Sequence, residues 1–361
     1  MKKFTNIIDY AENEKRNMRE LPFTPVDSLI LSQLSYVNID ELLHDSQTIM
    51  IKDLLKSEYF EKMFLNIFSP QSFKRFLFAL AASPRFRDIA IKYFINEVSL
   101  DATKQFSALT YILEDDSIYV AYRGTDGSII GWKEDFLLCF GEPIPSQLEG
   151  KTYFEGIAHT FSNRKLRVGG HSKGGNIAVY SASYCPINVS QRIIGLYSHD
   201  APGFSNVFFE SEDYLRVKEV FHNTLPQSSM IGMMLGNQDN YKVIVSNSKW
   251  FMQHDPFTWQ IKDADFEYAD KLSPSAHYTN RTFSNWISKM TCEEREAFIE
   301  TLFNVFKASD FDNLYDFAKD WKAKAPIVLK EFKHLNPDTK KMLKKIMYSF
   351  ATQAMKSLPN K

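Results

Sequence analysis

Apolar residues recur at three- and four-residue steps in the first part of the chain, which is the spacing of one face of an α-helix. The residues Phe73, Phe76, Leu77 and Leu80 follow this spacing, and the pattern predicts helix over residues 70–98. Residues 25–65 begin with an Asp-Ser helix-start signal and continue with apolar residues at helical steps. We therefore expect a helical cap segment over about residues 25–98.

After residue 105 the pattern changes to short runs of β-branched and aromatic residues, which are typical of strands. Residues 106–113 and 117–125 are two such runs, and the short polar string "EDD" between them predicts a hairpin. Further strands are expected at 165–170, 192–200 and 240–247, with helices over about 146–163 and 174–184. Alternating strands and helices predict an α/β fold, with a mostly parallel sheet and helices on both faces.

The chain from about residue 263 is expected to be helical almost to its end, with a break at Asn336-Pro337. Residues 321–361 contain ten lysines and two acidic residues, and apolar pairs from 342/343 to 354/355 form one helical face. We interpret residues 266–361 as a helical extension packed on a domain of residues 1–265. The alternative is peripheral contact between the basic C-terminal helix and an anionic membrane.

Composition and charge narrow the class of protein. With 44% hydrophobic and 14% aromatic residues, the 361-residue chain can bury a sizeable core. A net charge of −1 argues against nucleic-acid binding, for which a basic face is usual. The three cysteines form no CxxC, and the N-terminal string "MKKFTNIIDY" lacks the apolar run of a secretory signal, so we predict a cytoplasmic location.

The string "LRVGGHSKGGNIA" at residues 166–178 contains the pattern Gly-x-Ser-x-Gly around Ser172. An apolar strand precedes the serine and a helix-forming run follows it, which is the context of a nucleophile elbow. Gly170 and Gly174 flank the turn, where larger side chains would clash. The alternative interpretation is a glycine-rich turn with an inert serine.

A serine hydroxyl needs a base to become a nucleophile. Five histidines follow Ser172 in the chain: His199, His222, His254, His277 and His334. Only His254 lies in a loop-like context after a predicted strand, in "SKWFMQHDPFTW", where Pro256 prevents a helix from continuing. We therefore predict His254 as the base, the alternative being a structural histidine.

The base in turn needs a carboxylate that orients it. Asp200 ends the predicted strand 192–200, and Asp239, just before the next strand, is the competitor. Asp255 is adjacent to His254 and therefore points elsewhere in most backbone conformations. We predict Asp200 as the acid, with Asp239 as the alternative and a turn-capping role as the other interpretation of Asp200.

The tetrahedral intermediate of acyl transfer also needs donors for its oxyanion. One is the backbone N–H of the residue after the nucleophile, here Lys173. The second is expected from the loop after strand 117–123, where Gly124 allows a sharp turn and Thr125 offers its N–H and hydroxyl. In the apolar stretch 228–236, Met230, Met233 and Met234 are candidates for an acyl-binding wall, with ordinary core packing as the alternative.

The strings "YRGTDGSIIGWKEDF" and "GGHSKGGNIAVYSA" resemble the class 3 lipase group of α/β-hydrolases, in which an RGT strand end precedes a GHSxGG elbow. The stretches "DAPGF", "LPQSSMIGMML" and "QHDPFTW" are similar to its bacterial Mbeg-like branch. The resemblance spans roughly residues 20–265. It implies Ser172 as nucleophile, Thr125 and Lys173 as oxyanion donors, and His254 as base.

This sequence departs from the class 3 pattern at two points. Lys173 replaces the usual leucine, which predicts a cation beside the nucleophile. The stretch "FHNTLPQSS", where the acid would be expected, has no aspartate.

The function predicted is that of a serine carboxylester hydrolase, a lipase or esterase acting on a small-molecule ester or lipid without metal or cofactor. The alternative is a hydrolase-fold binding or scaffold protein, associated with a lipid or membrane surface.

Overall fold

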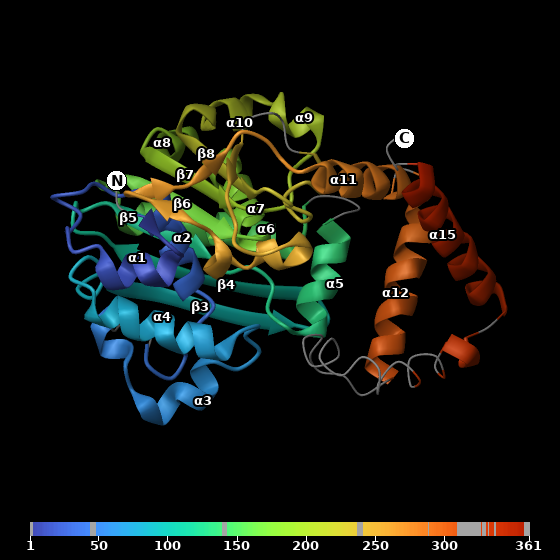
Figure 1. Ribbon diagram of the computed structural model, residues 1–361, viewed down its shortest axis with the longest axis horizontal. Coiled ribbons are helices and arrows are strands. Elements are labelled where there is room, and N and C mark those ends of the chain that lie inside the picture. Colours follow the sequence, from blue (N-terminus) through green and yellow to red (C-terminus); the bar gives the residue numbers. More distant parts are fainter. Residues whose placement is uncertain are drawn as a thin grey trace.

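In a computed structural model, the described residues form a nine-stranded sheet in the order β12-β9-β8-β7-β6-β5-β4-β3-β2 (Figure 1). The structure describes residues 3–43, 48–138, 143–236, 241–287, 289–308, 326, 330, 332–335 and 337–356. The strands are β2 Ile49–Met50, β3 Ala90–Ser99, β4 Lys104–Ile112, β5 Ile118–Tyr122, β6 Leu166–His171, β7 Ile193–His199, β8 Phe221–Pro226, β9 Lys242–Ile244 and β12 Tyr268–Ala269. Strands β5 to β9 are parallel, and antiparallel strands extend the sheet at both edges.

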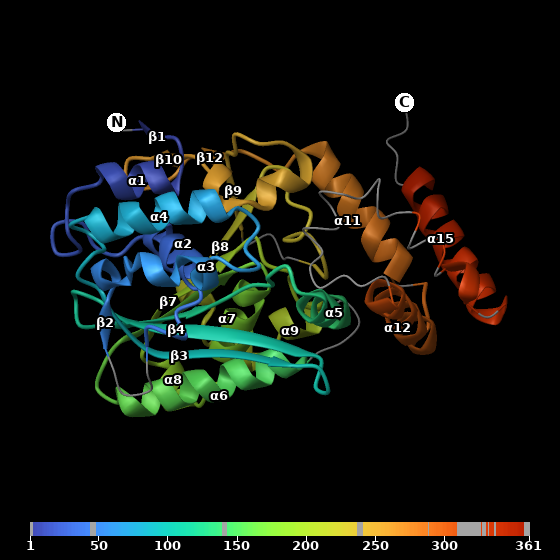
Figure 2. The same ribbon diagram turned by 90° about the horizontal axis from the view of Figure 1, so that it is seen from below.

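Helices cover both faces of this sheet (Figure 2). On one face lie α1 Ile7–Asn13, α2 Pro25–Leu34 and α4 Pro70–Ala82, and on the other lie α6 Pro145–Thr160 and α7 Lys173–Tyr184. Successive residues of β5 serve the two faces in turn: Tyr119 and Ala121 join one core cluster, whereas Val120 and Tyr122 join the other. This alternation is the two-residue period of a strand that is buried on both sides. The α/β-hydrolase fold expected from the sequence is confirmed.

The N-terminal segment contains less helix than its apolar spacing suggested. The predicted helix 70–98 ends at Ala82, and residues 90–99 are instead strand β3, which pairs with β4. Pro84 explains the stop, because the residue before a proline is disfavoured in the helical conformation. The predicted helix 25–65 is also interrupted: after α2 come β2, the 3-10 turns Ile51–Leu54 and Ser57–Tyr59, and the short α3 Phe60–Met63.

The strands and helices expected between residues 106 and 200 are present, whereas several other elements were not predicted. These are α5 Ile129–Leu138, α8 Ile187–Ser190, α9 Asn206–Phe209, α10 Glu212–Leu215, strand β8 and the 3-10 turns Lys218–Val220, Trp250–His254 and Pro256–Thr258. The described residues also contain a second sheet of three strands, which consists of β1 Lys3–Phe4, β10 Ile261–Lys262 and β11 Asp265–Phe266. The expectation of helix from residue 263 is therefore wrong for 265–269, where β12 also continues the main sheet.

The C-terminal region is helical and lies to one side of the sheet (Figure 1). It comprises α11 Pro274–Ile287, α12 Cys292–Ala308 and α15 Pro337–Lys356. Helix α15 packs along α11, buries Leu343 and forms a Lys345–Glu294 ion pair of 2.5 Å with α12. In the part of the chain that the structure describes, no helix is both long and apolar enough to cross a membrane.

Candidate active site

Strand β6 ends in a sharp turn that leads through Ser172 into α7. Ser172 has a φ of 57° and a ψ of −135°, and such a positive φ costs a residue with a Cβ roughly 1–3 kcal/mol. The flanking glycines make the turn sterically feasible. A Cβ at Gly170 would lie 2.2 Å from the carbonyl carbon of Gly174, and one at Gly174 would lie 2.2 Å from the carbonyl oxygen of Tyr122. The local backbone is therefore the strained strand–serine–helix turn expected from the sequence.

The neighbouring strand places Asp200 beside this turn. In the parallel pairing of β6 with β7, His171 is opposite His199, so Ser172 and Asp200 each follow the end of adjacent strands. The backbone N–H of Ser172 donates to the carbonyl oxygen of His199 over 3.0 Å and joins the two strand ends. Asp200 is fully buried and, like Ser172, has a positive φ, of 48°.

The carboxylate of Asp200 is held by groups from two later segments. Its Oδ1 accepts from the hydroxyl of Ser229 and from the backbone N–H of Gly232 at 3.2 Å. Its Oδ2 lies 2.6 Å from Nδ1 of His254. Because a Cβ at residue 232 would lie only 2.5 Å from Oδ1, glycine is needed for this approach. The predicted acid and base are thus brought together, and the alternative Asp239 falls in residues 237–240, outside the described residues.

His254 ends a 3-10 turn, and its side chain is 30% exposed. An ionised carboxylate only accepts hydrogen bonds, so the Asp200 contact assigns the proton of the neutral ring to Nδ1 and leaves Nε2 as a lone-pair acceptor. Among the described residues, neither Nε2 of His254 nor the hydroxyl of Ser172 makes another hydrogen bond. These are the groups that the sequence predicted as base and nucleophile, and no hydrogen bond joins them among the described residues.

His171, the residue before the serine, supports the ring of His254, and sequence reasoning missed it. Its Nε2 donates to the carbonyl oxygen of His254 over 2.9 Å, and the two rings lie 4.6 Å apart. The hydroxyl of Tyr36 donates to its Nδ1 over 3.3 Å. Burial, and then the neighbouring rings of His254 and His199, hold the pKa of His171 well below its usual value. A neutral His171 therefore anchors the turn that carries His254.

The loop after β5 approaches the serine closely. A Cβ at Gly124 would lie 2.6 Å from the carbonyl oxygen of His171 and 3.0 Å from the Cβ of Ser172. The next residue, Thr125, is buried, and the carboxyl of Asp135 from α5 lies beside its hydroxyl. Burial raises the pKa of Asp135 to about 6 against the opposing effect of the Lys173 charge. Thr125 thus directly follows the residue that approaches the serine turn, and Lys173 directly follows Ser172.

The side chain of Lys173 does not lie exposed beside the nucleophile as a free cation. It is 1% exposed, and its Nζ forms a 2.7 Å ion pair with Glu134, which is also buried. The expectation drawn from the leucine-to-lysine departure is corrected on this point, because the cation is neutralised by a carboxylate from α5. Within Lys173, the backbone N–H is therefore the candidate donor to substrate, and the side chain is not.

The three methionines of the predicted acyl wall have different surroundings. Met230 is 37% exposed and Met234 is half-buried, whereas Met233 is buried in a small core cluster with Leu225 and Val243. For Met233 the structure therefore has the core packing that was the alternative interpretation.

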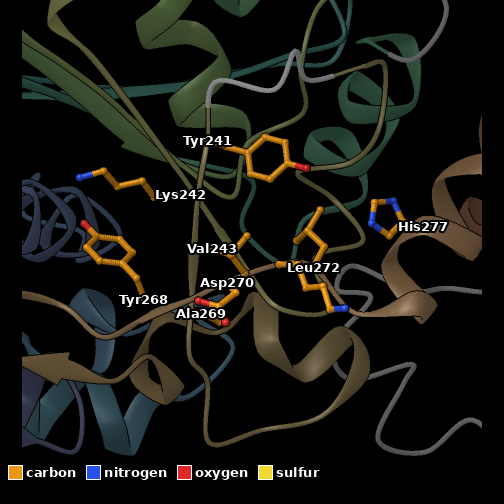
Figure 3. Close-up of a pocket in the computed structure, with 9 residues that line it drawn as sticks. Tyr241, Lys242, Val243, Tyr268, Ala269, Asp270, Leu272 and His277 are labelled. Carbon is orange, nitrogen blue, oxygen red and sulfur yellow. The ribbon is translucent and has the colours of Figure 1, made fainter.

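A pocket of about 450 Å³ lies at the β9–β12 edge of the sheet (Figure 3). Lys242 and Tyr268 line it, with the Lys242 amine 4.9 Å from the centre of the Tyr268 ring. His277, one of the histidines considered as a base, also lines this pocket. Both ring nitrogens of His199 are hydrogen-bonded, to Ser28 at 3.0 Å and to Thr224 at 2.8 Å, so this histidine has no ring nitrogen available to act as a base.

A sheet that is parallel through its centre, with a serine on a strained turn after a strand and an Asp–His pair beside it, defines the α/β-hydrolase class. Within that class, the chain belongs to the Mbeg1-like family, whose sequence model matches residues 80–304. The resemblance to the Mbeg-like branch is thereby confirmed. No curated protein matches the sequence.

Solved structures that resemble this chain include several fungal lipases. A lipase from Rhizopus microsporus var. chinensis has a TM-score of 0.33 and 17% identity, over 66% of this chain and 88% of its own. The Rhizomucor miehei lipase propeptide complex has 0.34 and 15%, over 66% and 80%. Lipase II from Rhizopus niveus has 0.34 and 12%, over 62% and 91%.

Proposed function

We propose that this protein is a serine carboxylester hydrolase of lipase or esterase type, which forms an acyl-enzyme on Ser172. One observation carries the proposal: Asp200 and His254 are in contact beside a strained turn that presents a serine. A carboxylate on Nδ1 prepares an imidazole to accept a proton at Nε2, which is the arrangement of a serine-hydrolase triad.

In the proposed reaction, Nε2 of His254 takes the proton of Ser172 as Oγ attacks the ester carbonyl. The tetrahedral intermediate collapses when His254 protonates the leaving alcohol, and an ester to Ser172 remains. Water then attacks this acyl-enzyme while His254 takes its proton. As the bond between the acyl carbon and Oγ breaks, His254 returns the proton to Ser172 and the carboxylic acid is released. Asp200 stabilises the imidazolium in both steps without taking the proton itself.

Two groups are proposed as oxyanion donors: the backbone N–H of Lys173 and the N–H or hydroxyl of Thr125. The close approach of Gly124 to Ser172 supports this assignment. Each preorganised donor lowers the barrier by about 3–4 kcal/mol. The substrate is a small-molecule ester or lipid, and Met230 and Met234 remain candidates for its acyl wall. The proposed location remains the cytoplasm.

The alternative function is that of a binding or scaffold protein with a catalytically inactive hydrolase fold. It would be favoured if no carboxylate contacted His254. The observed contact with Asp200 is the opposite arrangement, so we do not prefer this function.

Fluorophosphonate labelling of the purified protein tests the proposal. We expect one adduct on Ser172, identified by mass spectrometry, and none in Ser172→Ala or in the heat-unfolded wild type. A panel of nitrophenyl esters of increasing chain length should show hydrolysis that Ser172→Ala abolishes. A wild-type protein that neither labels at Ser172 nor hydrolyses any ester of the panel would exclude the enzyme interpretation.

A further inference from the structure

The side chains of Lys173 and Glu134 form a fully enclosed ion pair directly behind the nucleophile turn. Their exposed fractions are 1% and 0%, and Nζ lies 2.7 Å from Oε2. Two buried charges gain little stability over apolar side chains of similar size, because desolvation offsets their attraction. Because stability alone does not explain a buried pair at this position, we consider whether it positions other groups.

Every polar atom of the pair is used, and the partners come from different elements. Nζ of Lys173 also donates to the carbonyl oxygen of Gln105 over 2.9 Å and to its Oε1 over 3.2 Å. Oε2 of Glu134 accepts from the N–H of Gln105 at 3.1 Å, and Oε1 accepts from the N–H of Ser146 at 3.0 Å. The pair thus joins the start of α7, the middle of α5, strand β4 and the start of α6.

Helix α5 in turn touches the residue proposed as the second oxyanion donor. A Cβ at Gly131 would lie 2.9 Å from Cγ2 of Thr125 and 2.7 Å from Oε1 of Gln105, so α5 approaches both without space for a methyl group. Asp135, the neighbour of Glu134 in α5, has its carboxyl beside the hydroxyl of Thr125. The position of α5 therefore determines the position of Thr125.

We propose that the Lys173–Glu134 pair is a clamp that fixes α5, and with it Thr125, to the nucleophile turn, so that the two oxyanion donors keep a fixed separation. Lys173 then has two separate roles: its backbone N–H is a donor, and its side chain is a positioning group. This inference rests on the proposed function for its effect on catalysis. The mechanical part, that Lys173 holds α5, stands independently.

The test compares Lys173→Met, Glu134→Gln and the double variant with the wild type. The double variant removes both charges, so it folds without a buried unpaired ion, and the amide introduced by Glu134→Gln keeps an oxygen for one backbone N–H. A donor displaced by about 1 Å costs on the order of 10²-fold. We therefore expect kcat for a nitrophenyl ester to fall roughly 10- to 100-fold, with KM changed less than about threefold.

Because both single changes break the same clamp, the double variant should lose no more than either single variant. Gly131→Ala keeps both charged residues but crowds Thr125 and Gln105 with a new Cβ, and it should reproduce the loss in kcat. Multiplicative losses in the double variant, or a Gly131→Ala protein with wild-type kcat, would overturn the oxyanion part of the proposal.

Hydrogen exchange provides the readout that does not depend on activity. Peptides covering 124–138 should exchange at least about tenfold faster in the double variant than in the wild type. The control is Arg192→Met, which removes hydrogen bonds to the carbonyl oxygens of Ala158 and Arg164 at the opposite end of β7. It should leave both kcat and the exchange of 124–138 unchanged.

The two measurements separate the possible failures. Unchanged exchange in 124–138 shows that there is no clamp, whatever the activity. Faster exchange in a protein whose wild type neither labels nor hydrolyses esters keeps the clamp and rejects the proposed function.

Discussion

Replacement of Asp200 by Asn tests the proposed catalytic geometry most directly, because the outcome follows from the three hydrogen bonds of the carboxylate. Oδ1 accepts from the Ser229 hydroxyl and the Gly232 N–H, and Oδ2 accepts from Nδ1 of His254. An asparagine keeps the first two bonds only if its oxygen stays at the Oδ1 position. Its NH₂ group then faces Nδ1 of His254, where it can only donate.

To accept that bond, the neutral imidazole must move its proton to Nε2, and it then has no lone pair for the hydroxyl of Ser172. The same tautomer change in a serine-protease triad costs about 10⁴-fold in kcat. We expect kcat/KM of Asp200→Asn to fall about 10³- to 10⁴-fold, equivalent to roughly 4–5.5 kcal/mol of transition-state stabilisation. The loss of one charge-assisted bond lowers the free energy of unfolding by only about 1.5–3 kcal/mol, so the variant stays folded.

The assay is hydrolysis of the best nitrophenyl ester, with circular dichroism as the check on folding. The matched control is Asp255→Asn, the same change one residue after His254. Asp255 caps the next turn by accepting from the N–H of Phe257 over 3.0 Å, a bond that asparagine can keep. It should retain activity within about twofold of the wild type. An Asp200→Asn protein with more than a tenth of wild-type activity would refute this reasoning.

Three further predictions concern the support of the site. Gly124→Ala places a Cβ 2.6 Å from the carbonyl oxygen of His171, so we expect about 1–3 kcal/mol loss in urea unfolding together with loss of ester hydrolysis, and a variant with both intact would contradict the packing argument. Ser229→Ala removes one donor to Asp200, and we expect kcat to fall while fluorophosphonate still labels Ser172, more slowly than in the wild type. Burial lowers the pKa of His199 to about 3, against about 6.5 when unfolded, so its neutral form stabilises the fold above pH 6.5. That contribution is lost as the pH falls from about 6.5 towards 3, at up to ~1.4 kcal/mol per pH unit, and urea titrations of His199→Gln over this range should show a correspondingly smaller slope.

The sequence selected residues of the candidate site that the structure brings together, because these residues follow strand ends in a regular order. Ser172 lies between glycines, at positions where the turn leaves no space for a side chain. Asp200 follows the next strand in the chain. Parallel strands bring such positions to one edge of the sheet. His254 could be chosen because Pro256 limits its surroundings to a turn. These signals are local, and local signals can be read from a single chain.

What the sequence did not predict depends on contacts between distant residues. The direction of the Lys173 side chain is decided by Glu134, 39 residues earlier, and nothing near Lys173 indicates that partner. Strand β8 has the sequence "FHNTLP", whose polar residues and proline do not give the usual pattern of a strand. It nevertheless lies between β7 and β9 in the sheet. Strand β3 was read as helix because the apolar spacing before it was extended past Pro84. In each case tertiary pairing overrides the local preference.

The contact between α12 and α5 bears on how short the protein can be made. Lys133 of α5 forms a 2.6 Å ion pair with Glu300, and the rings of Phe136 and Phe303 lie 6.0 Å apart. A version of the chain that ends at residue 265, the predicted domain boundary, would lack Glu300 and Phe303. Helix α5, which lies next to Thr125, would then lose both contacts. The smallest unit in which to look for turnover therefore extends at least to Ala308.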